Sequence, residues 1–279
     1  MPSTTDESIG LLRLPLDKHF LINDGQHRRQ AIEEALKEDP TLSEQTISVV
    51  LFPEEDLESN QQMFSDLNRT VRKTSRSLDI LYDHRDPLNR ITLGVAGAVP
   101  VFKGRVEKDL VSLAVRSPKF ITLSALYDAN ARLLGKMKES ETDEEQEEEA
   151  EKRAITFWTT VTESIPEWRH IAQGELKPSE ARAEFVHGHA VGFWALGAAG
   201  GALIEKYPSA EDWRARLAML SEVDWRRVNP DWQGICMLGS DIINRRQTRE
   251  ATAKYIQWPL GLTQEKPGTV LEVPEGLKL

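Results

Sequence analysis

A short DGQHRR segment near the N-terminus holds the residues whose types and spacing best suit chemistry. Gly25 allows a ligand to approach the backbone closely, while Arg28 and Arg29 supply fixed positive charge and forked N–H donors that match phosphate oxygens. His27 can donate a hydrogen bond or carry a proton near neutral pH. Asp24 can cap a helix, hold a metal or bind a ribose hydroxyl. The segment therefore predicts a site for phosphate groups.

The elements around this segment place it at the start of a helix. Residues 19–23 are predicted as a strand, and residues 26–37 as a helix whose apolar residues recur on one face. The free N–H groups of a helix's first turn, at the positive end of its dipole, bind anions. Helical spacing directs Arg28 toward the body of the domain, where it needs a carboxylate or a bound anion as partner. In the alternative interpretation Asp24 is only a cap, and the arginines pair with Glu33 and other surface acids.

A second basic cluster lies within residues 59–86. A helix is predicted to end near Asn68 and Arg69, and a new helix follows the basic loop with Thr74 or Ser75 as its N-cap. Basic residues beside Ser or Thr at a helix start suit contact with the phosphates of a nucleotide or of a nucleic-acid backbone. The alternative is a solvated basic loop.

A third basic segment, residues 242–250 (IINRRQTRE), is predicted as helical. It would lie along DNA phosphates or, alternatively, form an exposed face that is paired with acids. No helix-turn-helix pattern specifies which element enters a groove. The residues of the second and third clusters that we expect to contact DNA are Arg72, Lys73, Arg76, Arg245, Arg246 and Arg249.

The composition describes a globular protein with an uneven charge. Hydrophobic residues make up 39% and charged residues 29% of the 279 residues, which excludes wholesale disorder. The net charge is −10, but residues 139–151 hold nine acids and no base, so the remainder carries only −1 and has room for a positive patch. The single cysteine, Cys236, excludes a disulfide framework and a cysteine-built zinc site and indicates the cytoplasm. The sequence has no apolar stretch long enough to cross a bilayer and no signal-peptide pattern.

The chain is expected to adopt an α+β fold of two domains. An N-terminal domain at residues 1–135 is followed by an acidic linker at 136–152 and an all-helical domain at 153–279. The predicted strands are residues 11–16, 19–23 and 47–52. The predicted helices are residues 26–37, 57–67, 75–82, 88–94, 124–137, 156–165, 179–207, 210–220 and 235–258.

Three features of the C-terminal part are expected to be structural. His187 and His189 would be either metal ligands or hydrogen-bonding core residues, and the absence of an adjacent carboxylate pair favours the core. The glycines of residues 192–203 predict close helix packing. The tryptophans are expected in the core rather than on a base-stacking surface; they are Trp158, Trp168, Trp194, Trp213, Trp225 and Trp232.

Four separated blocks of the sequence carry a family resemblance. They are FLINDGQHRRQAI, MFSDLNRTVRKTSRSLDILYDHRDP, VHGHAVGFWALG and LSEVDWRRVNPDWQG, in this order. From residue 12 to residue 262 the chain thus resembles the DndB family of bacterial DNA phosphorothioation (DNA sulfur modification) systems. Family members usually carry a further stretch before the first block, so we expect the chain to be a shortened member or a fragment.

The DGQHR signature in turn resembles the ParB/sulfiredoxin superfamily, in which a G-x-x-R box binds the phosphates of a nucleotide. The resemblance implies an N-terminal domain of this type with ATP or CTP and Mg²⁺ as candidate ligands. Sulfiredoxins carry a nucleophilic cysteine directly before the His-Arg pair, where this chain has Gln26, so sulfinic-acid reduction is not expected. The implied phosphate-binding residues are Gly25, Gln26, His27, Arg28 and Arg29, with Asn68 and Arg69 as the second box.

The resemblance implies a DNA-binding regulator, a transcriptional repressor of the modification cluster. The alternative is a ParB-like nucleotide hydrolase or a nuclease acting on DNA, in which Asp24 and His27 position water or a metal. A third hypothesis is a protein-interaction subunit of the modification machinery. The expected partners are double-stranded DNA, other DNA sulfur modification proteins and further copies of the chain, without a membrane.

Overall fold

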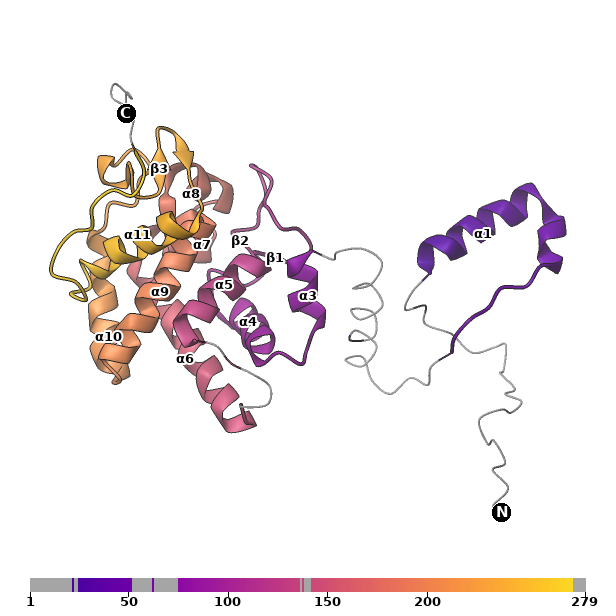
Figure 1. The fold of residues 1–279 in the computed structure, drawn as a ribbon, viewed down its shortest axis with the longest axis horizontal. Helices are drawn as coiled ribbons and strands as arrows, with labels where there is room; N and C mark the ends of the chain where they lie inside the picture. The colour runs from indigo at the N-terminus through magenta and orange to yellow at the C-terminus, as the bar shows by residue number, and fades with distance from the viewer. Residues whose placement is uncertain are drawn as a thin grey trace, which may run out of the picture. The chain divides into compact units, whose positions relative to one another are not determined.

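The computed structural model describes residues 22, 25–51, 62, 75–135, 137 and 142–272. The chain divides into two compact units, Met1–Leu67 and Asn68–Leu279. The domain boundary expected at residues 136–152 falls inside the second unit. Residues 144–152 of the expected linker form the first turns of a helix, α6 (Glu144–Ser164) (Figure 1).

The first unit holds the helix predicted after the DGQHR turn. It runs as α1 (Gln26–Glu38) and is followed by a short 3₁₀ helix, η1 (Pro40–Glu44). No described side chain of α1 is buried, and Arg28 is exposed; that it faces the body of the domain stays a prediction, because most of this unit lies outside the described residues. The predicted strand at residues 47–52 is also wrong for the described residues 47–51, because no described strand pairs with them. The strands at 11–16 and 19–23 and the helix at 57–67 lie outside the described residues except at single positions.

The second unit is mostly helical with a few small strands, which is consistent with an α+β class. Two parallel strands, β1 and β2, pair Val106 with Ile121, and two antiparallel strands, β3 and β4, pair Met237 with Ile242. Its elements before α6 are α3 (Arg76–Tyr82), α4 (Pro87–Ala98), β1 (Val106–Glu107), β2 (Ile121–Thr122) and α5 (Leu123–Leu134). Those after α6 are α7 (Pro166–Gln173), α8 (Pro178–Glu184), η3 (Val186–Gly188), α9 (Ala190–Lys206), α10 (Ala210–Leu217), η4 (Ala218–Glu222), η5 (Pro230–Trp232), β3 (Met237–Leu238), β4 (Asp241–Ile242) and α11 (Arg246–Gln257).

The C-terminal part is not all-helical, contrary to the sequence prediction. The predicted helix 235–258 begins only at Arg246, because β3 and β4 form a hairpin ahead of it. Gly239 in the connecting turn has φ +60°, a left-handed conformation that suits glycine and ends the helical pattern. The predicted helix 179–207 is likewise divided, with η3 between α8 and α9.

Close backbone contact between α5 and α9 organises the core. A Cβ added at Gly197 would lie 2.2 Å from the Ala129 carbonyl oxygen, and one at Gly201 would lie 2.4 Å from that of Arg132. Only glycine therefore permits this approach, which confirms the packing role expected of the glycine run. No helix among the described residues is both long and apolar enough to cross a membrane.

The tryptophans confirm the core prediction. Trp158 and Trp168 are fully buried, stack at 6.2 Å between ring centroids and meet Phe102 edge-on. Trp213, Trp225 and Trp232 are also buried, while Trp194 is half-buried beneath the Arg132 guanidinium at 4.8 Å. The tryptophans thus serve as packing residues, and the base-stacking surface is not supported.

The acidic start of α6 has its own local explanation. Asp143 forms a capping box with Gln146, and Glu144, Glu145 and Glu147 lie in the first turn, where the positive end of the helix dipole favours them. Arg90 of α4 holds Glu147 through two hydrogen bonds of 2.7 and 2.5 Å. The later turns of α6 carry the buried tryptophan and phenylalanine side chains, so one helix passes from a solvated acidic end into the core.

Candidate nucleic-acid interface

The turn before α1 shows the backbone that the sequence predicts. Gly25 has φ +106° and ψ 12°, and its carbonyl accepts a hydrogen bond from the Arg29 N–H at 2.8 Å. A Cβ on Gly25 would lie 3.6 Å from Nη2 of Arg28, so the Arg28 guanidinium lies beside the turn. The side chain of Gln26 donates to the Ile22 carbonyl at 2.7 Å. Glycine and arginine are therefore brought together at the start of the helix.

Arg29 follows the alternative interpretation instead. Its Nε lies 2.7 Å from Oε1 of Glu33, and both side chains are more than half exposed. Exposed pairs of this kind contribute only about 0.3–0.5 kcal/mol. The remaining residues predicted for this site lie outside the described part of the chain: Asp24, Asn68, Arg69, Arg72 and Lys73, together with the side chain of His27.

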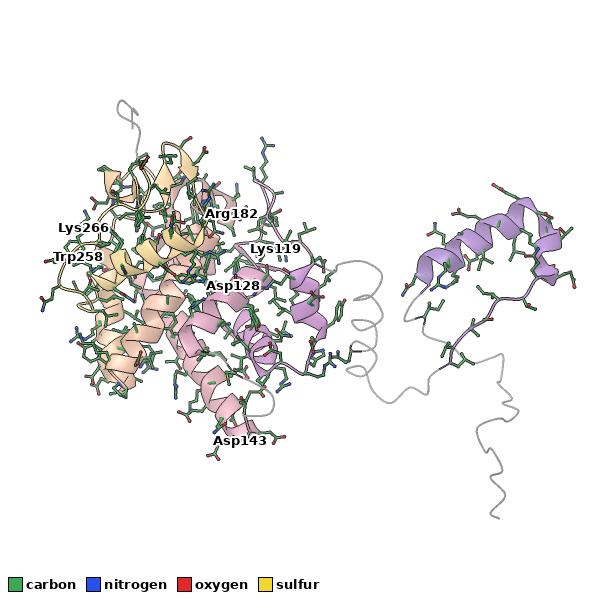
Figure 2. All side chains as sticks on the ribbon, viewed as in Figure 1. Lys119, Asp128, Asp143, Arg182, Trp258 and Lys266 are labelled. Atoms are coloured by element: carbon green, nitrogen blue, oxygen red, sulfur yellow. The ribbon has the colours of Figure 1, made fainter. Side chains whose placement is uncertain are left out.

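In the second unit, two arginines predicted to contact DNA meet on one carboxylate. Nη2 of Arg76 in α3 lies 2.6 Å from Oδ1 of Asp128 in α5, and Nη1 of Arg249 in α11 lies 3.7 Å from Oδ2. Asp128 is labelled in Figure 2. The Arg76 guanidinium also lies 5.4 Å from the centre of the Tyr127 ring. Asp128 balances one of the two cations, and a second carboxylate, Asp86, accepts a hydrogen bond from the Tyr127 hydroxyl at 3.0 Å.

The beginning of α11 adds two more of the predicted residues. Arg246 is 89% exposed and pairs with Glu250 at 2.9 Å, one turn along the helix. Arg245 is exposed and forms no ion pair with a described residue. Arg249 also donates from Nε to Oδ1 of Asn244 at 2.7 Å, which fixes its direction. At the start of α3, the predicted N-cap Ser75 is confirmed, because its hydroxyl accepts a hydrogen bond from the Leu78 N–H.

Both histidines form hydrogen bonds within the protein, as expected; His187 is buried in the core and His189 is half-buried. Trp168 donates from Nε1 to Nδ1 of the fully buried His187 at 3.0 Å, so the His187 proton sits on Nε2, 3.4 Å from Glu167. Burial lowers the pKa of His187 and keeps it neutral. His189 donates from Nε2 to the Arg182 carbonyl at 2.6 Å. The described residues contain no group of three or more His, Cys, Asp or Glu that could hold a metal.

The lone cysteine is placed away from solvent. Cys236 is fully buried between η5 and the β3–β4 hairpin. Burial raises the pKa of its thiol to about 12, so the thiol stays protonated and is a poor nucleophile. The side chain is therefore a core residue in this fold.

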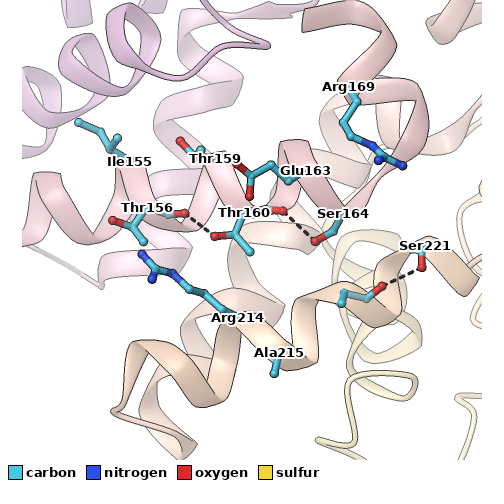
Figure 3. Close-up of a pocket in the computed structure, with 11 residues that line it drawn as sticks. Ile155, Thr156, Thr159, Thr160, Glu163, Ser164, Arg169, Arg214, Ala215 and Ser221 are labelled. Carbon is cyan, nitrogen blue, oxygen red and sulfur yellow. Dashed lines mark hydrogen bonds between the residues drawn. The ribbon is translucent and has the colours of Figure 1, made fainter.

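A groove between α6 and α10 with a mixed polar and apolar lining was missed by sequence reasoning. It has a volume of about 820 Å³ and is drawn in Figure 3. Thr156, Thr160 and Ser164 form one of its walls, each donating its hydroxyl proton to a carbonyl four residues earlier. Arg169 and Arg214 contribute its cations. The spacing of the three hydroxyl residues, four apart along one helix, is the signal that would have shown this wall.

Comparison with known proteins gives one match, which covers nearly all of the chain. The sequence profile of the DndB family, described as DNA-sulfur modification-associated, matches residues 1–263. No curated protein and no solved structure is significantly similar to the chain. The match includes the DGQHR turn, Arg76, Asp128 and Arg249. The chain belongs to the DndB family of DNA-sulfur modification-associated proteins.

Proposed function

We propose that this protein is a DNA-binding regulator, a transcriptional repressor, of a bacterial DNA phosphorothioation system. Family membership connects the chain with DNA sulfur modification. The observation that carries the DNA-binding proposal is the convergence of Arg76 and Arg249, from two helices far apart in the sequence, on Asp128. Arginine side chains held in this way match the oxygens of a phosphodiester.

Asp128 holds the two guanidinium groups without neutralising both of them. Each arginine uses one carboxylate oxygen, so further N–H donors of the two forks remain for a phosphate. Arg245 and Arg246 extend the positive charge at the start of α11. Phosphate contacts of this type give affinity and position a protein on duplex DNA.

The proposal includes a ParB/sulfiredoxin-type nucleotide site in an N-terminal domain. The positive φ of Gly25 and the neighbouring Arg28 guanidinium support phosphate binding at the start of α1. ATP or CTP with Mg²⁺ is the proposed ligand, and nucleotide occupancy would regulate the affinity for DNA. Replacing Arg28 and Arg29 together by alanine is expected to abolish nucleotide binding without unfolding the chain.

The experiment is a titration of the full chain with promoter DNA of its modification cluster and with random DNA, at two salt concentrations. We expect tighter binding to the promoter and a loss of affinity in the double variant Arg76→Ala/Arg249→Ala. The salt slope should fall by about two, one for each lost phosphate contact. The matched control is Arg153→Ala/Arg226→Ala, because both arginines are exposed and paired with acids at 2.6 Å.

Equal binding by both double variants would overturn the proposed interface. The enzymatic alternative is separated by a turnover measurement with ATP, CTP and duplex DNA as substrates. Turnover by the wild-type chain that disappears in His27→Ala would overturn the regulator proposal in favour of a hydrolase or a nuclease. Copurification with other DNA sulfur modification proteins, together with no salt-sensitive DNA affinity, would point to a protein-interaction subunit.

A further inference from the structure

Residues 103–119 contain β1 and the loop that leads from it to β2, and this segment is here named the clamped loop. Its base is closed by the Val106–Ile121 pairing and by a 2.6 Å hydrogen bond from the Phe120 N–H to the Arg105 carbonyl. Figure 1 shows the loop extending from the helical body next to α3 and α8. Its position therefore depends on what holds its two sides.

Arg182 of α8 holds the side of the clamped loop that leads into β2. The residue is only 9% exposed, and its guanidinium donates to the backbone carbonyls of Ala114, Val115, Ser117 and Lys119. The distances to the first three are 3.2, 3.1 and 3.0 Å. One buried cation thus fixes the backbone of four loop residues; Figure 2 labels Arg182 and Lys119 close together.

The start of α3 holds the other side of the clamped loop. The Ser75 hydroxyl donates to the Asp109 carbonyl at 2.5 Å, and the Ser77 hydroxyl donates to the Leu110 carbonyl at 3.1 Å. Glu107 accepts from the Asp109 and Leu110 N–H groups. Because Arg76 lies between the two serines, the loop is attached directly beside the proposed DNA-contacting arginines.

The clamped loop presents apolar side chains and cations to solvent. Leu110, Val111 and Val115 are 57, 64 and 86% exposed. Five cations and two acids give the segment a charge of +3 in a chain of charge −10. Lys108 and Arg116 are exposed and form no ion pair with a described residue. The backbone of the clamped loop is held by at least six hydrogen bonds. It carries exposed aliphatic side chains and cations, which is typical of a surface that contacts a partner.

We propose that the clamped loop contacts duplex DNA, with Lys108 and Arg116 on phosphates and the aliphatic side chains against the sugars and base edges of a groove. This inference rests on the proposed function and adds an element to it. Charge complementarity and continuity with Arg76 favour DNA over a protein partner. Minor-groove proteins combine apolar side chains with basic neighbours in this way, and the fixed backbone lowers the entropy lost on binding.

The charge part of the proposal is tested with charge reversal in the full chain. Arg116→Glu is compared with Arg214→Glu, since both arginines are exposed, neither has an ion pair with a described residue, and both variants change the net charge equally. We expect Arg116→Glu alone to weaken binding to a promoter duplex. The double variant Lys108→Ala/Arg116→Ala should lower the salt slope by about two.

The apolar part is tested with Val115→Ser against Val228→Ser, which replaces a valine that is 77% exposed outside the clamped loop. We expect roughly fivefold weaker DNA binding for Val115→Ser only, from the lost burial of an aliphatic side chain. The salt slope should stay unchanged because no charge is lost. Thermal unfolding of each variant confirms that all of them are folded.

The outcomes separate this inference from the proposed function. If the wild-type chain binds no DNA, both fail. If Arg76→Ala/Arg249→Ala loses DNA binding while the clamped-loop variants match their controls, only the loop contact is overturned. Loop variants that keep full DNA affinity but no longer copurify with another DNA sulfur modification protein would assign the loop to a protein partner and overturn the DNA contact.

Discussion

His189 donates a hydrogen bond from Nε2 to the backbone carbonyl of Arg182 over 2.6 Å. It therefore supports the residue that holds the clamped loop. Burial lowers the pKa of His189 from its usual 6.5 to about 4, with smaller contributions from the charges of Arg227 and Arg182. The folded state thus keeps this imidazole neutral at a pH where the unfolded chain takes up a proton.

The free energy of unfolding should consequently depend on pH. Since the folded pKa is depressed, the stabilisation is complete above pH 6.5 and is lost as the pH falls from 6.5 toward 4. A shift of this size corresponds to about 3 kcal/mol. Urea denaturation across this pH range measures the loss, which should be smaller in His189→Gln because glutamine does not titrate. An identical pH dependence in the variant would contradict the assignment to His189.

Removing the guanidinium of Arg182 should release the clamped loop. Arg182→Met leaves four carbonyls without their donor, and we expect a loss of about 2–3 kcal/mol in the free energy of unfolding. Trypsin should cut after Arg116 and Lys119 faster than in the wild-type chain. Arg226→Met is the control, because that exposed arginine pairs only with nearby Asp224 and should change stability by less than about 0.5 kcal/mol. Equal trypsin rates in the two variants would argue against the clamp.

Two glycine substitutions should act in opposite directions. Gly197→Ala places a methyl group 2.2 Å from the Ala129 carbonyl oxygen, and we expect a destabilisation of at least about 2 kcal/mol as α5 and α9 separate. Gly97→Ala in α4 meets no atom within 4 Å and should stabilise the protein by about 0.5–1 kcal/mol through helix propensity. Thermal unfolding measures both. Similar melting temperatures in the two variants would show that the helices adjust without cost.

Asp128→Asn should strengthen DNA binding. The amide keeps an acceptor for Arg76 but no longer competes with phosphate for the charge of Arg76 and Arg249. We expect a lower dissociation constant at 0.1 M salt and a steeper salt dependence than in the wild-type chain, measured by fluorescence anisotropy. Weaker binding would indicate that the carboxylate is needed to orient the two arginines.

Local signals in the sequence account for much of the second unit. The Ser75 cap and the helix behind it follow from side-chain chemistry within one turn. The burial of the tryptophans and the packing role of the α9 glycines follow from residue size. A tryptophan fills a large space in the core, and a glycine leaves room for the neighbouring helix to approach. The hairpin of β3 and β4 was missed, because the apolar residues 235–237, the last of which begins β3, fit a helix and a strand equally well.

Relationships across long sequence separations could not be predicted in this way. Nothing near Asp128 in the sequence indicates that Arg76 and Arg249 approach it from two other helices. Arg182 lies in a short helix whose sequence pattern is typical of the protein surface. Its hydrogen-bond partners are backbone carbonyls more than sixty residues earlier in the chain. At the DGQHR turn, the left-handed conformation of Gly25 could be predicted from the sequence. The exposure of Arg28 could not, because helical periodicity shows only which residues share a face and not whether another element covers that face.

The acidic first turns of α6 and the positive clamped loop belong to the same compact unit, and Asp143 and Lys119 lie well apart in Figure 2. Such a separation gives this unit an electric dipole moment. A polyanion would repel the molecule as a whole and still exert a torque that turns the loop toward it. Within about one Debye length, roughly 10 Å at 0.1 M salt, the orientation in which the clamped loop faces the polyanion is therefore favoured over the reverse one before any specific contact forms.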